Sequence, residues 1–178
     1  MGKRNLKQHR DNQQAKARGQ TVSRKDSKAD GYRVVMANMR NFFERLDGFV
    51  PAADRMWTCY ADERVDAPTN GYAHSYLPFN AKGTNEFADR HYLSYPVNVF
   101  MVTDVMHYLQ KNGAEVTNDD YALTCMVQWI WRSAIRNGEP VTLYLPSQRM
   151  RNLLTGWMQS VEQMYKDFAK RQTAAAAV

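Results

Sequence analysis

The sequence predicts an α/β domain in which helices flank a small, mainly parallel β-sheet. Segments with helical periodicity of apolar residues alternate with short runs rich in aromatic and β-branched residues, which favours a layered α/β architecture. The chain has 178 residues, of which 44% are apolar, so it is long enough for one domain with a buried core. The two cysteines, Cys59 and Cys125, match no CxxC spacing, so we expect packed thiols rather than a disulfide or zinc site.

Positive charge is concentrated at the amino terminus. The formal net charge is +6, and residues 1–28 hold nine Lys or Arg and two Asp, which leaves the remainder at −1. We expect a basic disordered tail over 1–28, a folded domain over 30–170 and a disordered C-terminus over 171–178. Such a tail either contacts phosphates nonspecifically or is a solubilising leader without a specific partner.

No membrane association is expected. No apolar run approaches the roughly 18 residues that a membrane-spanning helix needs, and the amino terminus lacks the apolar segment of a secretory signal. These features predict a cytoplasmic protein.

The first ordered segments are a helix and two strand-like runs. A helix is expected from Asp30 or Gly31 to about Asp47. Its apolar side is formed by residues at helical spacing, namely Val35, Met39, Phe42, Phe43 and Leu46. Two β-type runs follow, RMWTCY at 55–60 and AHSYLPF at 73–79.

A long helix is then expected from about Asn85 to Asn112. Pro96 should kink or divide it, and Gly113 should end it. The apolar residues that suggest this helix are Phe87, Leu93, Val97, Phe100, Met101, Val105, Tyr108 and Leu109.

The clearest helix begins at Thr117 or Asn118, where a polar side chain can accept from free backbone N–H groups. Gly138 is its expected left-handed stop, and VTLYL at 141–145 is a buried-looking strand. Ser147 caps a last helix. Its apolar stripe continues to about Lys170 and comprises Met150, Leu153, Leu154, Trp157, Met158, Val161, Met164, Tyr165 and Phe168.

A polar stripe runs along the 118–136 helix, opposite its apolar face. Gln128, Arg132 and Arg136 stand at steps of four residues, which places them on one side of a continuous helix. They are therefore candidates for one shared binding site.

The segment QWIWRSAIRNGEPVTLYL resembles motif VI of superfamily 2 helicases, whose usual form is Q-x-x-G-R-x-G-R before a short turn and an apolar strand. Gln128 falls on the motif's glutamine and Arg132 on its first arginine. Trp131 stands where the family has glycine. Ile135 occupies the second arginine position, and Arg136 follows one residue later. On a helix this shift leaves the second guanidinium near the same face.

A wider resemblance, to the last part of helicase-like proteins of phages and prophages, covers about residues 55–158. RMWTCY, NAKGTNEF at 80–87 and the block 119–158 carry it. In that layout, 80–87 stands at the fifth helicase motif, a turn close to phosphate and nucleic acid. The resemblance implies an incomplete C-terminal RecA-like lobe, the second of the two lobes of a helicase. It also implies a location in the host cytoplasm or in association with the virion.

The resemblance also implies roles for the polar stripe. Such helicases bind ATP between two lobes, and the second lobe places arginines on the γ-phosphate. Arg132 and Arg136 would be these arginine fingers, and Gln128 would position phosphate or water. A guanidinium stays charged and pairs with phosphate oxygens, and an arginine finger can raise turnover by roughly 10³ to 10⁵.

Further phosphate contacts are expected from two helix starts. Lys82, Thr84 and Asn85 would hold a phosphate of ATP or of the nucleic-acid strand through side chains and backbone N–H groups. Arg149 and Arg151, near the start of the last helix, are either solvent-facing or also meet phosphate.

The sequence lacks the first half of an ATP site. It contains neither the phosphate-binding loop GxxxxGK[ST] nor a DExD/H magnesium motif. The chain is therefore not expected to be an ATPase alone. The expected partners are a first-lobe protein with a phosphate-binding loop, which shares the ATP, and a nucleic acid, DNA or RNA. His74, His91 and His107 lack ligand spacing, so no bound metal is expected.

Two other classes of function remain open. One is a nonenzymatic nucleic-acid-binding protein in which the basic tail does most of the binding. The other is a virion-associated structural protein that keeps the fold as a scaffold. Trp129 and Trp131 fit core or interface positions better than base-stacking platforms.

Overall fold

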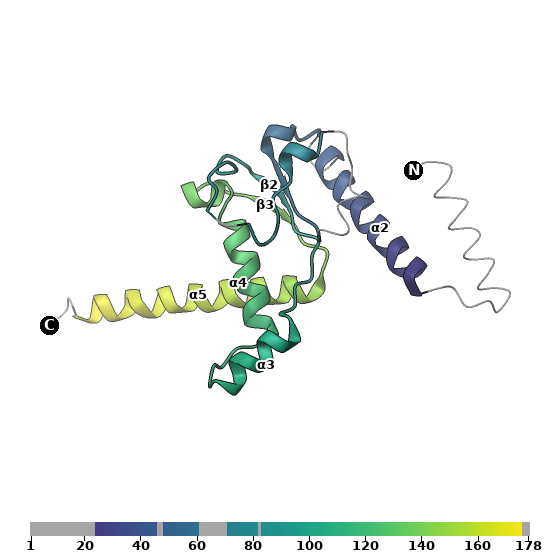
Figure 1. Ribbon diagram of the computed structural model, residues 1–178. Coiled ribbons are helices and arrows are strands. Elements are labelled where there is room, and N and C mark those ends of the chain that lie inside the picture. The colour runs from purple at the N-terminus through teal and green to yellow at the C-terminus, as the bar shows by residue number, and fades with distance from the viewer. Residues whose placement is uncertain (1–23, 46–47, 61–70, 82, 176–178) are drawn as a thin grey trace. The chain divides into compact units, whose positions relative to one another are not determined.

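The computed structural model describes residues 24–45, 48–60, 71–81 and 83–175 (Figure 1). The chain divides into two compact units, Met1–Asn38 and Met39–Val178. Helix α2 (Arg24–Arg45) contributes residues to both units, and it begins before the expected start at residue 30. The sheet and the described candidate site residues belong to the second unit.

Three short parallel strands form the sheet. They are β1 (Arg55–Trp57), β2 (Tyr92–Ser94) and β3 (Thr142–Tyr144), in the order β1-β2-β3. Because β2 is central, it hydrogen-bonds to both neighbours. The predicted α/β class with a small parallel sheet is confirmed.

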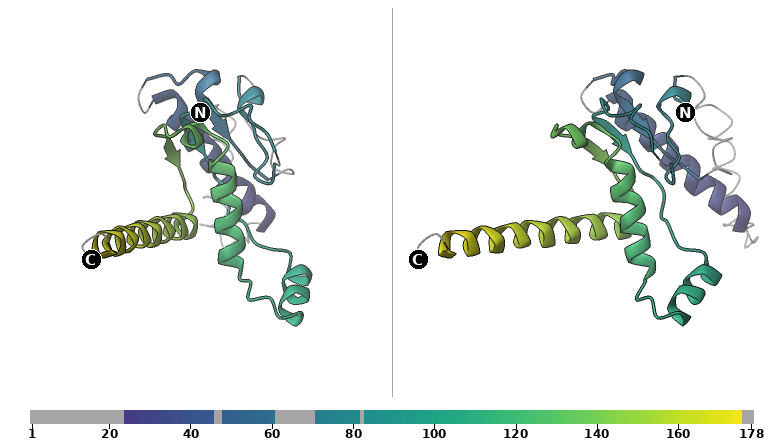
Figure 2. Two further views of the ribbon diagram at one scale, coloured as in Figure 1. Left: turned by 90° about the vertical axis from the view of Figure 1, so that its left-hand side faces the viewer. Right: turned by 60° about the vertical axis from the view of Figure 1, so that its left-hand side comes forward.

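Helices α4 (Asn118–Ile130) and α5 (Gln148–Ala175) supply the core on one face of this sheet. The first turns of α5 lie against α4 (Figure 2). The central buried cluster joins strand and helix residues, among them Met56, Leu93, Tyr95, Met126, Trp129, Ile130 and Met150. On the other face, Phe42 of α2 stacks on Tyr144 with ring centroids 5.5 Å apart. The sheet is thus covered on both faces, as parallel sheets require.

Two predicted elements are wrong. The run 73–79 is not a strand: it begins as the 3-10 helix η3 (Ala73–Ser75), and only Tyr76 makes an isolated bridge to Trp57. The long helix over 85–112 is replaced by turns, strand β2, an extended segment and the short helix α3 (Thr103–Lys111). The buried residues of the extended segment alternate, as Leu93, Tyr95, Val97 and Val99. This period of two belongs to an extended chain packed on a core.

Helix α4 begins as predicted and ends early. Thr117 forms a capping box with Asp120, whose side chain accepts from the Thr117 backbone N–H. The helix stops at Ile130, Ser133 is extended with φ −89° and ψ −172°, and the 3-10 helix η4 (Ala134–Asn137) follows. The predicted continuous stripe is therefore wrong, because Arg132 and Arg136 lie beyond the helix that carries Gln128. Gly138 has the predicted left-handed conformation, with φ +80°, but it ends η4 and not α4.

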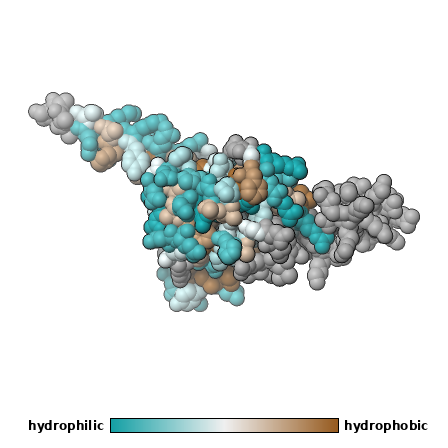
Figure 3. Space-filling view, turned by 90° about the horizontal axis from the view of Figure 1, so that it is seen from above, coloured by the Kyte–Doolittle hydropathy of each residue, from teal (hydrophilic) through white to brown (hydrophobic). Residues whose placement is uncertain are grey.

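Most of α5 is exposed. Met150 is buried and Leu153 and Leu154 pack against the core, whereas the apolar residues from Trp157 onward are mostly exposed. Both brown and teal side chains are visible along this helix on the left of Figure 3. Of the helices in the described ranges, none has the length and apolar composition needed to cross a bilayer.

Candidate functional site

The candidate site lies at the amino-terminal edge of the sheet, where the segments before β2 and β3 meet. The backbone N–H of Ala134 donates to the Arg90 carbonyl oxygen at 3.0 Å, and the Asn137 side chain donates to the Ala88 carbonyl oxygen at 2.9 Å. Arg136 donates from Nη1 to Asn85 Oδ1 at 2.5 Å. The structure therefore joins two residues that the sequence singles out separately, Arg136 and Asn85.

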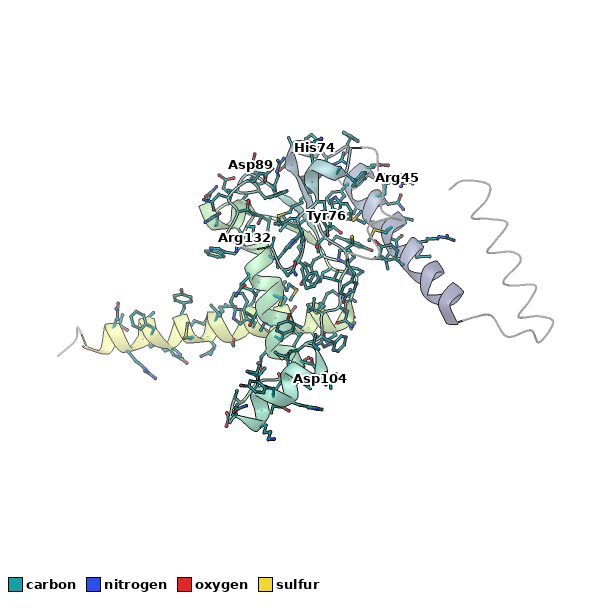
Figure 4. The ribbon with its side chains drawn as sticks, in the orientation of Figure 1. Arg45, His74, Tyr76, Asp89, Asp104 and Arg132 are labelled. Carbon is teal, nitrogen blue, oxygen red and sulfur yellow. The ribbon has the colours of Figure 1, made fainter. Side chains whose placement is uncertain are left out.

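Arg132 and Gln128 differ from Arg136 in having no polar partner within the described part of the chain. Arg132 is half-buried in the turn after α4, and Gln128 is exposed on the last turns of that helix. Neither side chain has a hydrogen bond or ion pair with any other residue that the structure describes. Figure 4 shows Arg132 beside the C-terminal end of α4. Its guanidinium keeps its hydrogen-bonding groups available for a ligand.

The segment around Thr84 forms turns rather than a helix start. Thr84 Oγ1 accepts from the Glu86 backbone N–H at 3.2 Å, and α3 does not begin until Thr103. The expected cradle of helical N–H groups at this segment is therefore wrong. Lys82 lies outside the described residues.

Arg149 lies at the opposite, carboxyl-terminal edge of the sheet and is held by the protein itself. Nε and Nη2 contact Asp119 Oδ1 at 2.9 and 2.7 Å, and Nη1 donates to Asn98 Oδ1 and to the Val99 carbonyl oxygen, both at 2.9 Å. The guanidinium carbon lies 4.4 Å from the centroid of the Phe100 ring. These contacts join the start of α5 to the start of α4 and the segment after β2, which is a structural role.

Replacing Arg149 with methionine is expected to lower the free energy of unfolding by about 2 kcal/mol, because several charge-assisted hydrogen bonds are lost at once. Urea denaturation of the full chain measures this. Arg151→Met is the matched control. Within the described ranges, Arg151 bonds only to the Leu145 and Pro146 carbonyl oxygens and to Gln148, all close in sequence, so its loss should cost under about 1 kcal/mol. Equal losses for both variants would contradict the structural role of Arg149.

A cluster around His91 was not found by reasoning from the sequence. Nδ1 of His91 lies 2.7 Å from Asp54 Oδ1, and Nε2 lies 2.7 Å from Glu139 Oε2. The hydrogen bond to Glu139 and then the one to Asp54 raise the pKa of His91 above its ordinary value of 6.5. Among the described residues, no group of three or more His, Cys, Asp or Glu is arranged to hold a metal ion.

A sequence signal for this cluster does exist. Asp54 and His91 each directly precede a strand, and Glu139 lies three residues before the third. Residues that precede parallel strands meet at the same edge of the sheet. The sequence hides this signal because the apolar residues around β2 predict a helix.

Comparison with known proteins places the chain in a family. The family model described as "YonV C-terminal Rossmann-like domain" matches residues 2–158. The SPbeta prophage-derived uncharacterized protein YonV of Bacillus subtilis (strain 168) is 38% identical over 105 residues. The aligned region covers 59% of this chain and 26% of that protein, so the chain spans about a quarter of this relative. No solved structure matches.

The family description agrees with the coarser part of the expected resemblance, a C-terminal α/β domain of a phage-derived protein. The match covers most of the chain, including β1, β2, β3, α4 and the start of α5. The chain belongs to the family of YonV C-terminal Rossmann-like domains.

Proposed function

We propose that this chain is the second, arginine-bearing lobe of a two-lobe, ATP-driven motor that acts on nucleic acid. The observation that supports it is the meeting of the 84–90 and 134–137 segments at one edge of the sheet. The first segment overlaps 80–87, which stands where the fifth helicase motif would be, and the second lies within 128–145, which resembles the sixth. Their contact leaves Arg132 without a partner among the described residues while Arg136 is fixed by Asn85.

The two arginines have different tasks in this proposal. Arg132 is available to donate two parallel hydrogen bonds to the γ-phosphate of ATP, since a guanidinium is planar and permanently charged. Arg136 is anchored by Asn85, so it orders the turn and adds positive potential next to Arg132. Charge that develops on the transferred phosphoryl group is then stabilised by groups that are already in place.

The position of the site supports action in trans. Open parallel sheets usually bind nucleotides at the carboxyl ends of their strands, where the backbone can cradle phosphate. Arg132 and Arg136 belong to the opposite edge, and the sequence has no phosphate-binding loop. The lobe would therefore approach an ATP that another lobe holds, and would not bind ATP tightly by itself.

Reconstitution tests this proposal. The partner is a first-lobe protein that has a phosphate-binding loop and lacks an arginine finger of its own. Its ATP hydrolysis is measured in the presence of nucleic acid, with and without this chain. The expected result is that adding the chain raises turnover by about 10³-fold or more. Tight ATP binding by this chain alone, with no effect on the partner's turnover, would overturn the proposal.

A second candidate function is nonenzymatic binding of nucleic acid. The observation that favours it is the contrast between two tryptophans: Trp129 is 2% exposed, whereas Trp131 is 55% exposed and directly precedes Arg132. An exposed indole beside a guanidinium can stack on a base while the cation meets the phosphate.

Removing residues 1–23 tests whether the tail or the Arg132 region is the main nucleic-acid contact, because this deletion leaves α2 intact and takes away six Lys or Arg residues. If the tail does most of the binding, affinity for single-stranded nucleic acid and most of its salt dependence are expected to disappear. Fluorescence anisotropy over a salt series measures both. An unchanged salt slope would reject the tail as the main contact and leave the Arg132 region in that role.

A further inference from the structure

We propose that His91 is a positioning residue, an imidazolium latch that ties the turn carrying Arg136 to the amino ends of β1 and β2. The latch itself stands on the geometry of His91, Asp54 and Glu139. Its consequence for phosphate binding rests on the proposed function.

The three side chains join three segments that are far apart in the sequence. Asp54 ends the 3-10 helix η1 (Ala52–Asp54) before β1, His91 immediately precedes β2, and Glu139 lies in the turn between η4 and β3. Asp54 Oδ1 accepts from both the backbone N–H and the ring Nδ1 of His91, at 2.9 and 2.7 Å. The other ring nitrogen, Nε2, reaches Glu139 Oε2 at 2.7 Å. The imidazole therefore bridges two carboxylates.

Only the protonated ring satisfies both contacts. An imidazolium donates from both nitrogens, whereas a neutral imidazole carries one N–H and offers a lone pair to the second carboxylate. Asp54 also accepts from the backbone N–H of His91, so it keeps a bond in either state. The side chain of Glu139 is 53% exposed, and the His91 ring is its only polar partner among the described residues. Deprotonation is therefore expected to release Glu139.

Of the charged groups that the structure describes, Asp54 and Glu139 are the two that act on the ring. The neighbouring Arg90 donates from Nη1 to the Ala52 carbonyl oxygen, and its Nε lies 3.3 Å from the Asp89 carboxylate. The raised pKa of His91 comes from Glu139 and Asp54 and is partly opposed by burial. The folded state thus favours the proton. The stabilisation is fully present below pH 6.5, while the carboxylates remain ionised, and is lost as the pH rises through the higher folded pKa.

Glu139 connects the latch to the arginines through the backbone. Its N–H donates to the Ala134 carbonyl oxygen at 3.3 Å, which closes the turn around η4, and the intervening Gly138 has φ +80°. Ala134 and Arg136 anchor the other side of the turn to Arg90 and Asn85. When Glu139 is released, the turn keeps these anchors but loses its side-chain tie to His91 and Asp54, so its position becomes less defined.

The latch is tested by an NMR titration of the full chain alone. We expect the imidazole of His91 to titrate above pH 6.5 in the wild type and at a lower pH in Glu139→Gln. In the wild type only, the amide signals of residues 134–138 should titrate with the same midpoint as the His91 imidazole. Glu115→Gln, which removes an exposed carboxylate after α3, is the matched control and should change neither. An unchanged His91 midpoint in Glu139→Gln, or amides that do not titrate in the wild type, would overturn the latch.

A second measurement separates the latch from the motor. ATP turnover of the reconstituted motor is expected to fall as the pH rises through the His91 midpoint, and this step should be missing in Glu139→Gln and in His91→Gln. A retained step in both variants would overturn the positioning role. Because the NMR titration uses neither ATP nor a partner, a motor that never assembles would count against the proposed function and leave the titration result standing.

Discussion

Replacing Arg132 with alanine is expected to lower ATP turnover by the assembled two-lobe motor by about 10³-fold or more. Arg132 has no polar partner among the described residues, so its removal breaks no hydrogen bond or ion pair with them. The loss should therefore fall on turnover, with little change in the free energy of unfolding or in assembly with the first lobe. Steady-state hydrolysis under saturating ATP measures turnover, urea denaturation of the variant measures the free energy of unfolding, and size-exclusion chromatography with the first lobe measures assembly.

Two matched variants show whether the effect comes from the guanidinium. Arg132→Lys keeps the charge but loses the planar fork, and it should recover only part of the turnover. Arg171→Ala removes an equal charge from the exposed part of α5 and should leave turnover unchanged. Full turnover by Arg132→Ala, or an equal loss in Arg171→Ala, would rule out Arg132 as an arginine finger.

Replacing Trp129 with alanine is expected to destabilise the fold by about 3–5 kcal/mol, since a fully packed indole leaves a cavity that the core fills only in part. Trp129 is buried, its ring centroid lies 5.2 Å from that of Tyr95, and its Nε1 donates to the Leu77 carbonyl oxygen at 3.0 Å. The substitution also leaves that carbonyl group without its partner. The midpoint and slope of a urea denaturation curve report the loss.

The control for this change lies two residues further on. Trp131 is mostly exposed, so Trp131→Ala should alter the free energy of unfolding by less than about 0.5 kcal/mol. A small effect at Trp129, or a large one at Trp131, would mean that the end of α4 packs differently from the structure.

The fold class follows from the sequence because local signals and tertiary packing agree for several elements. The strand at 55–57, the capped start of α4, the Gly138 turn and the strand at 142–144 are all found where predicted. The 85–112 segment fails because its apolar residues fit a helical period loosely and an alternating period better. Burial on the core selects the alternating arrangement of Leu93, Tyr95, Val97 and Val99.

The site could be predicted only in part. Ser133 breaks the helix between Gln128 and Arg136 without a glycine or proline to mark the break, while the apolar pattern continues through Ala134. Helical spacing could therefore not place the arginines. Their position depends on contacts between η4 and the 84–90 segment, which is distant in the sequence.

The structural role of Arg149 was equally hidden. Its partners lie at the start of α4 and in the segment after β2. The position of Arg149 and Arg151 near a helix start does not indicate these partners. The His91 cluster depends in the same way on three strands lying side by side. These contacts are tertiary and depend on the order of the strands in the sheet. They cannot be predicted from a single sequence unless that order is known.

The most direct test of the central claim is the structure of the assembled motor trapped with ADP and aluminium fluoride, a mimic of the phosphoryl group in transfer. We expect the Arg132 guanidinium to lie within hydrogen-bond distance of the fluoride ligands and Asn85 still to hold Arg136. A trapped complex in which the phosphoryl mimic is contacted by arginines of the other lobe alone, with Arg132 facing solvent, would contradict it.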